Sequence, residues 1–86
     1  MGPIAARKAA RNVEMLGTVL AIEYLAAAQA IDFRRPLRSS ARLEEAHARL
    51  RRRVAYWETD RPAAPDIEAA REVLEGDLGD LLGELR

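Results

Sequence analysis

Residues 19–33, with the sequence VLAIEYLAAAQAIDF, form an alanine-rich apolar run inside a longer segment of helical pattern. On a helical wheel of about 100° per residue, one side of this segment is polar at Arg7, Arg11, Glu14, Thr18 and Asp32. Three apolar residues interrupt that same side, at Ala21, Leu25 and Ala28. A helix that is apolar nearly all round is usually buried in a large core or a membrane. Because 86 residues offer little other chain, the sequence predicts a helix that partners surround.

Helical patterns cover most of the chain, without a strand pattern or an internal repeat. The sequence therefore predicts an all-α fold in which one long buried helix is followed by two or three shorter helices, as a single helical segment over residues 1–86. The long helix should occupy residues 3–33, because Pro3 suits a first turn and Pro36 prevents continuation. The later elements are a second helix over 40–57, a proline-rich loop over 58–65, a third helix over 66–76 and a weak tail helix over 77–86.

Apolar residues recur at helical spacing in both of the shorter helices. In the second helix they lie at alternating steps of four and three, at Leu43, His47, Leu50, Val54 and Trp57. In the third helix they form a narrow stripe at Ile67, Ala70 and Leu74, and the tail repeats it at Leu78, Leu81, Leu82 and Leu85. Ser39 and Ser40 are expected to cap the second helix, and Gly76 is expected to stop the third.

The charges balance over the whole chain, with fourteen basic and fourteen acidic residues, but they are unevenly distributed. Residues 1–56 contain eleven Lys/Arg against five Asp/Glu, and residues 57–86 contain three against nine. The arginines alternate with leucine and alanine at helical spacing, which disfavours a nucleic-acid-binding tail. Glu23, Gln29 and Asp32 argue against a membrane span. The sequence thus predicts no nucleic-acid partner and no membrane.

The residue types present exclude several kinds of chemistry. Without cysteine the chain has no disulfide, thiolate nucleophile or zinc-thiolate site, and it is compatible with a reducing cytoplasm, where we expect it. With one histidine and no cysteine, the sequence shows no ligand spacing typical of a metal site. No glycine-rich phosphate loop or paired-carboxylate motif occurs either. We therefore assign no catalytic, cofactor-binding or metal-binding residue within the chain.

Glu23 is the carboxylate with the most unusual expected surroundings. It lies amid apolar residues of the long helix, at Leu16, Val19, Leu20, Ala27 and Ala30. Such a carboxylate could act as a general acid or base, or it could form a buried ion pair with an arginine of another segment or subunit. The ion pair is the favoured interpretation.

The remaining candidate side chains also have structural interpretations. His47 has no adjacent serine or cysteine to activate, so we expect a packed or hydrogen-bonded histidine. Tyr56 and Trp57 could stack on a ligand, but aromatic residues that end a helix more often seal a core. A positive patch at Arg49, Arg51, Arg52 and Arg53 could bind phosphate or an acidic helix, and the acidic third helix is the favoured neighbour.

Three stretches occur together in a characteristic order: residues 1–37, which include IAARKA and LAIEYLAAAQA, the later AHARLRRRV, and DRPAAPDIEAA. In this order and spacing they resemble the C-terminal part of the histidine ammonia-lyases, a branch of the aromatic amino-acid lyase family. The resemblance covers residues 1 to about 78. The phenylalanine and tyrosine lyases and the related aminomutases share the same architecture.

The resemblance implies an all-helical homotetramer in which long helices of several subunits pack into a central bundle. It also implies elimination of ammonia by a methylidene-imidazolone group, which forms autocatalytically from an internal Ala-Ser-Gly that this chain lacks. The family's tyrosine base, its substrate-binding asparagine, glutamine and arginine, and the glutamate of its Glu-Asp-His-Val-Ser stretch all lie upstream of the matched segment. Met1 and Gly2 align with the residues directly after that stretch, so no catalytic residue carries over to this chain.

Two functional hypotheses follow. In the first, the chain is the C-terminal segment of an enzyme that converts L-histidine to trans-urocanate and ammonia, and alone it is inactive. It would then be a truncated gene product, a proteolytic remnant or half of a split enzyme, with self-association or the missing catalytic body as its partner. In the second, it is a stand-alone helical module for oligomerisation or partner binding.

Overall fold

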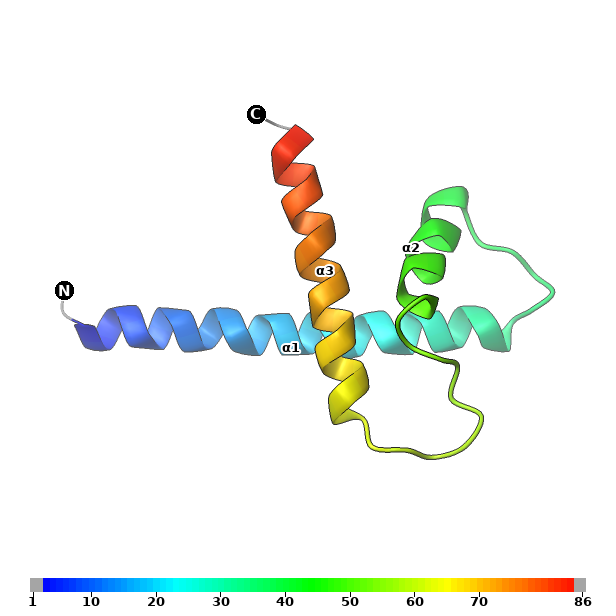
Figure 1. Cartoon of the computed structure of the whole chain (residues 1–86), viewed down its shortest axis with the longest axis horizontal. Coiled ribbons are helices and arrows are strands. Elements are labelled where there is room, and N and C mark those ends of the chain that lie inside the picture. The colour runs from blue at the N-terminus through cyan, green and yellow to red at the C-terminus, as the bar shows by residue number, and fades with distance from the viewer. Residues whose placement is uncertain (1–2, 85–86) are drawn as a thin grey trace.

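The computed structural model describes residues 3–84, without the side chains of residues 81, 82 and 84. This described part contains three helices and no strand: α1 (Pro3–Phe33), α2 (Ala41–Arg51) and α3 (Ala64–Glu84). Helix α3 crosses α1 near its middle, and α2 lies toward the C-terminal end of α1 (Figure 1). The overall extents are 53 × 36 × 16 Å, so the arrangement is flat. The all-α prediction is confirmed.

Helix α1 occupies the range expected from the sequence. Its 31 residues begin at Pro3, which has no N–H to leave unsatisfied in a first turn. Beyond Phe33 the helical bonds give way to turns, in which the N–H of Arg34 donates to the carbonyls of Ala30 and Ile31 at 3.2 and 3.1 Å. Pro36 follows and cannot donate a backbone hydrogen bond, so the helix, whose last residue is Phe33, does not continue through it.

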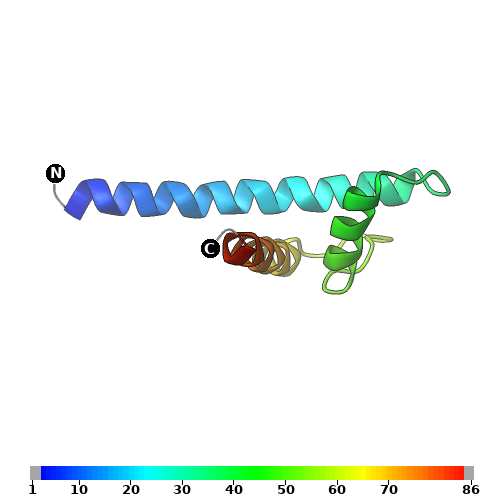
Figure 2. The same ribbon diagram turned by 90° about the horizontal axis from the view of Figure 1, so that it is seen from above.

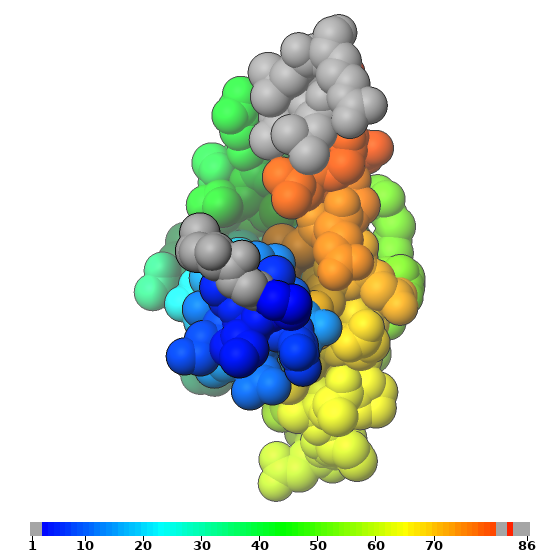
Figure 3. Space-filling model, turned by 90° about the vertical axis from the view of Figure 1, so that its left-hand side faces the viewer, coloured from blue at the N-terminus to red at the C-terminus, as the bar shows by residue number. Residues whose placement is uncertain are grey.

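Within this chain α1 is mostly exposed, and its burial by partners, which the sequence predicts, stays a prediction. Only Ala21 and Ala28 of α1 are buried. Figure 2 shows that α2 and α3 lie on the same side of α1, and in Figure 3 the N-terminal part of α1 projects freely toward the viewer. Two shorter helices cannot surround one of 31 residues. By length and composition alone α1 is long and apolar enough to cross a membrane, a test that the core helix of a soluble protein also passes. In the structure 11% of its apolar 18-residue window is buried.

The side of α1 that α2 and α3 cover is the side where the sequence shows an interrupted polar stripe. Ala21 and Ala28 are buried there, and Leu25 packs against them. Small side chains at these positions let other helices approach the α1 backbone closely. The apolar interruption of the polar stripe therefore marks the contact within the chain, and the more uniformly apolar side remains open.

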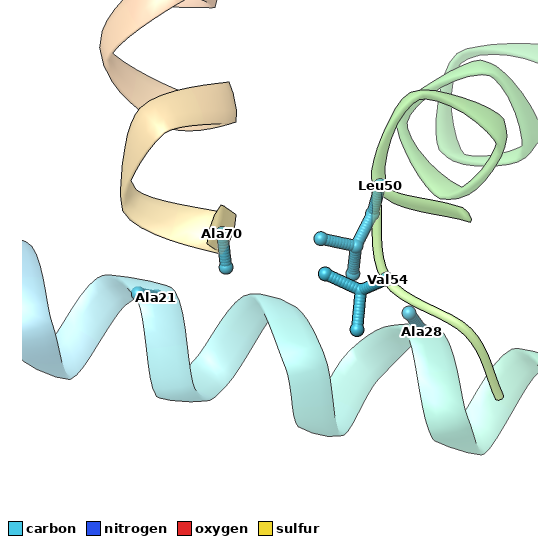
Figure 4. Close-up of a cluster of buried hydrophobic side chains, with 5 residues drawn as sticks. All are labelled: Ala21, Ala28, Leu50, Val54 and Ala70. Atoms are coloured by element: carbon cyan, nitrogen blue, oxygen red, sulfur yellow. The ribbon is translucent and has the colours of Figure 1, made fainter. Parts of the chain in front are cut away.

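The core is small and lies where the three helices meet (Figure 4). Its buried members are Ala21, Ala28, Leu50, Val54 and Ala70, and Tyr24, Leu25, Ile67, Ala69 and Leu74 pack around them. The largest fully buried side chains among the described residues are those of Leu50 and Val54. The Tyr24 hydroxyl donates to the carbonyl of Ala46 and so joins α1 to α2. Ile67, Ala70 and Leu74 lie on the predicted apolar stripe, which is confirmed.

Helix α2 begins at the predicted cap but ends six residues early. Ser40 is its N-cap, and the Ser40 hydroxyl accepts a hydrogen bond from the Leu43 N–H at 3.3 Å. The last helical residue is Arg51, whereas the sequence predicted helix to residue 57. The guanidinium of Arg51 donates to the carbonyl of Val54 at 3.2 Å and holds the chain in a turn that brings Val54 into the core. Of the predicted stripe, Leu50 and Val54 are buried, but Leu43 is 54% exposed.

Helix α3 is longer than predicted, because Gly76 does not stop it. A glycine ends a helix when it adopts a positive φ, and no described glycine does so. The residues after Gly76 include leucines and an aspartate, Asp77, which pairs with Arg49 of α2 at 2.5 Å. The expected third and tail helices are therefore one helix. Leu78 is 56% exposed, and the side chains of Leu81, Leu82 and Leu85 lie outside those described.

Candidate functional site

The polar centre of the structure is Asp32, at the junction of α1 and α2. Its Oδ1 accepts a hydrogen bond from His47 Nε2 at 2.8 Å, and its Oδ2 accepts one from Arg51 Nε at 2.8 Å. Arg51 Nη2 also lies 3.4 Å from the side-chain oxygen of Gln29. The Asp32, His47 and Arg51 side chains are 19%, 12% and 16% exposed, so the cluster is largely removed from water.

Electrostatic contacts with the Asp32 carboxylate hold this cluster of side chains together. Partial burial by itself would raise the pKa of Asp32, but the hydrogen bonds from Arg51 and His47 outweigh it and hold the pKa below its usual value. Because the acceptor is a carboxylate, the Nε2 atom of His47 carries the proton. The prediction that His47 is a hydrogen-bonded histidine is confirmed. The sequence did not single out Asp32 as its partner, although Asp32 lies on the same side of α1 as Ala21 and Ala28.

A second ion pair fixes the connection between α1 and α2. Both carboxylate oxygens of Glu44 accept from the guanidinium of Arg35, at 2.9 and 2.7 Å, and one also accepts from the Ser39 N–H at 2.8 Å. The hydrogen bonds from Arg35 and from the Ser39 backbone lower the pKa of Glu44 to about 2. Ser39 and Ser40 thus both serve the start of α2, as predicted, and Glu44 completes the arrangement.

Trp57 holds the proline-rich loop against α1 and α3. Its indole N–H donates to Asp66 at 2.6 Å, and its backbone carbonyl accepts from Gln29 at 3.3 Å. The Arg61 guanidinium also donates to Asp66 at 2.9 Å and lies 5.5 Å from the Trp57 ring centroid. Tyr56, in contrast, is 38% exposed. Trp57 fixes the loop but does not belong to the buried core cluster, so the prediction that these aromatic residues seal the core stays a prediction.

Beside Trp57 lies an apolar cavity of about 270 Å³. Its lining includes Ile22, Leu25, Gln29, Arg51, Trp57 and Ile67. The guanidinium of Arg51 also donates to Asp32 and to the carbonyl of Val54.

The arginines of the predicted positive patch separate in the fold. Arg49 pairs with Asp77 at 2.5 Å and Arg53 pairs with Glu72, so the acidic third helix is their neighbour as predicted. Arg51 pairs with Asp32 of the first helix. For Arg52 the structure records no side-chain partner among residues 3–84. The patch is therefore only partly neutralised by α3.

Glu23 is exposed in the structure, so the chain itself does not supply the predicted buried ion pair. It lies on the side of α1 that faces away from α2 and α3. Within the described residues, no group of three or more His, Cys, Asp or Glu side chains could hold a metal ion. The polar side chains at the helix junctions mainly bond one another, and among residues 3–84 no buried side-chain polar atom lacks a partner. These polar contacts therefore serve to orient the helices relative to one another.

Comparisons with known proteins identify the family of this chain. The family model described as aromatic amino acid lyase matches residues 1–52. Histidine ammonia-lyase of Vibrio cholerae is 49% identical over 75 residues, which are 87% of this chain and 15% of that protein. Histidine ammonia-lyase of Anaeromyxobacter dehalogenans is 54% identical over 79 residues, 91% of this chain and 16% of that protein. The mouse histidine ammonia-lyase is 53% identical over 74 residues, 86% of this chain and 11% of that protein.

The chain thus spans between 11% and 16% of the length of these three relatives. No solved structure matches it significantly. Alignments of 74 to 79 residues extend past residue 52, so the similarity continues beyond the part that the family model covers. The family expected from the sequence motifs is confirmed: the chain belongs to the aromatic amino acid lyase family.

Proposed function

We propose that this chain forms the C-terminal helical segment of a histidine ammonia-lyase, which eliminates ammonia from L-histidine to give trans-urocanate. Relatives of that name, 49% to 54% identical over most of this chain, support the assignment. In this proposal the segment supports a catalytic site that other parts of the enzyme supply, in a cytoplasmic homo-oligomer.

The observation that carries the proposal is the open apolar side of α1. Five large side chains of this helix are between 45% and 61% exposed: Met15, Leu16, Val19, Leu20 and Ile22. Covering a half-exposed side chain of this size contributes roughly 1 kcal/mol, so covering all five favours association by several kcal/mol. Monomeric proteins rarely expose such a contiguous surface. Glu23 lies within it, so the covering helix should bring a cation to pair with that carboxylate.

The catalytic group of the family does not fit the residues present here. A methylidene-imidazolone needs an Ala-Ser-Gly tripeptide, and the two serines of this chain stand in the sequence Arg38-Ser39-Ser40-Ala41. The Ser40 hydroxyl is an N-cap, and the Ser39 N–H donates to Glu44. We therefore assign no step of the reaction to residues of this chain, and we expect the chain alone to be inactive.

The alternative function is a stand-alone helical module that self-associates or binds a partner through α1. The same exposed side chains favour it, because two copies of α1 could cover each other. Both hypotheses predict oligomers in sedimentation experiments. They differ in whether enzyme activity appears when the missing parts are supplied.

The test is complementation. We expect urocanate formation, followed by its ultraviolet absorbance, when this chain is mixed with a polypeptide of a histidine ammonia-lyase that ends before the matched segment. Leu16→Glu places a charge on the open side of α1 and should abolish complementation, whereas Leu43→Glu, on an equally exposed leucine of α2, should retain it. No activity with a soluble, folded partner would contradict the enzyme proposal in favour of a separate module. Equal activity of the Leu16 variant would instead show that the open side of α1 is not the surface that the rest of the enzyme covers.

A further inference from the structure

An open pocket of about 480 Å³ lies between the connection that follows α1 and helix α2, and four of its seven lining residues are arginines. Four arginines contribute to it, Arg35, Arg38, Arg51 and Arg52, together with Glu44 and His47. These arginines come from the connection after α1 and from the end of α2, so only the tertiary fold brings them together.

Two of the four guanidinium groups are held in place by carboxylates. Glu44 binds Arg35 through both oxygens, at 2.9 and 2.7 Å. Asp32 binds Arg51 at 2.7 Å. Because these carboxylates fix the arginine side chains, little side-chain entropy remains to be lost when a ligand binds them.

The other two guanidinium groups retain their charge. The Arg38 side chain is 70% exposed and lies 3.8 Å from a Glu44 oxygen that already pairs with Arg35. Arg52 is exposed and has no recorded side-chain partner among residues 3–84. Among the described side chains, none of α3 lines this pocket, and Asp77, Glu72 and Asp66 of that helix pair with Arg49, Arg53 and Arg61.

We propose that this pocket binds a divalent oxyanion of the phosphate type, either inorganic phosphate or a phosphate monoester. Four guanidinium groups stand against the two carboxylates of Glu44 and Asp32, which leaves an excess of two positive charges. A phosphate at neutral pH carries a charge of about −1.5 to −2, and planar guanidinium groups match its oxygens in pairs. Binding reduces the repulsion among the arginines that line the pocket. This proposal does not depend on the proposed enzyme function.

The test is calorimetric titration of the 86-residue chain with sodium phosphate at constant ionic strength, with a phosphate monoester in a parallel arm. We expect saturable binding at one site. Arg38→Gln and Arg52→Gln each remove an unneutralised guanidinium without breaking an internal pair of short distance, and each should weaken binding about tenfold. Arg42→Gln is the matched control, because Arg42 is an exposed arginine of α2 outside the pocket, and it should bind as the unmodified chain does.

Thermal unfolding followed by circular dichroism provides the second measurement. Phosphate should raise the Tm of the unmodified chain and of the Arg42 variant more than it raises the Tm of the Arg38 and Arg52 variants. Equal stabilisation of all four proteins would indicate a general salt effect and would overturn the proposal. So would the absence of saturable binding, or an equal loss of affinity in the Arg42 variant. Tighter binding of an acidic peptide than of either phosphate would overturn it in favour of a protein-binding surface.

Discussion

Leu50→Ala should destabilise the fold more than any other single truncation of α2. Leu50 has no exposed surface, and it and Val54 are the largest fully buried side chains among the described residues. Leucine-to-alanine changes at buried sites cost about 2–5 kcal/mol, depending on how far the neighbours close the cavity. Here the nearest core members of α1 are alanines, Ala21 and Ala28, whose short side chains cannot fill the space. We therefore expect a loss of about 3 kcal/mol.

That loss is large for a chain of this size, since a domain of 86 residues has a total stability of roughly 5–13 kcal/mol and this core is small. Urea titrations followed by circular dichroism and by the fluorescence of Trp57 measure it. They should be run at two protein concentrations, because association through α1 would add stability that depends on concentration.

Leu43→Ala is the matched control, because Leu43 lies on the same helix and is 54% exposed. It should cost less than about 1 kcal/mol. A loss below about 1 kcal/mol for Leu50→Ala would refute the core described here. Equal losses for both variants, growing with protein concentration, would show instead that association buries α2 as much as the contact with α1 does.

Three further predictions concern the helix junctions and α3. Asp32→Asn leaves the largely buried Arg51 guanidinium without its carboxylate, so it should lower the free energy of unfolding by about 1–3 kcal/mol. Urea titrations measure this loss, which should be absent when Arg51 is already replaced by methionine. Because the pKa of Glu44 is lowered from 4.5 to about 2, its contribution to stability is present above pH 4.5 and is lost as the pH falls toward 2. The acid-induced loss of Tm over this range should therefore be smaller in Glu44→Gln. An identical pH profile of the two proteins would contradict the pairing with Arg35. The Cβ added by Gly76→Ala or Gly79→Ala meets no atom within 4 Å, so each change should stabilise α3 by about 0.5–1 kcal/mol. The measurement is a rise in Tm. A fall in Tm would mean that α3 does not continue through these glycines.

Much of the candidate site was predictable from residue types and spacing. The cap at Ser40 and the hydrogen-bonded His47 follow from local rules, and the structure shows both of them. The uneven distribution of charge favoured the acidic third helix as the neighbour of Arg49, which the structure also shows. The Asp32 partner of His47 did not follow, because it depends on where α2 crosses α1. The cationic pocket did not follow either, since its four arginines come from two separate parts of the chain.

The sequence by itself determined the helices and the family. The pattern of alanines and leucines over residues 3–33 specified a long helix, because helical bonds are local and Pro36 ends them. The order of the stretches IAARKA, LAIEYLAAAQA and DRPAAPDIEAA specified the aromatic amino acid lyase family, which the family model matches.

Only the tertiary structure decided where α2 and α3 end and which side of α1 they cover. The turn after Arg51 depends on burying Val54 in a core shared with Ala28, and the continuation of α3 past Gly76 brings Asp77 to Arg49. The chain packs its partly polar side inward, because Asp32 finds His47 and Arg51 there, and it leaves the more apolar side open. Contacts between distant residues set these outcomes, and a local pattern does not contain them.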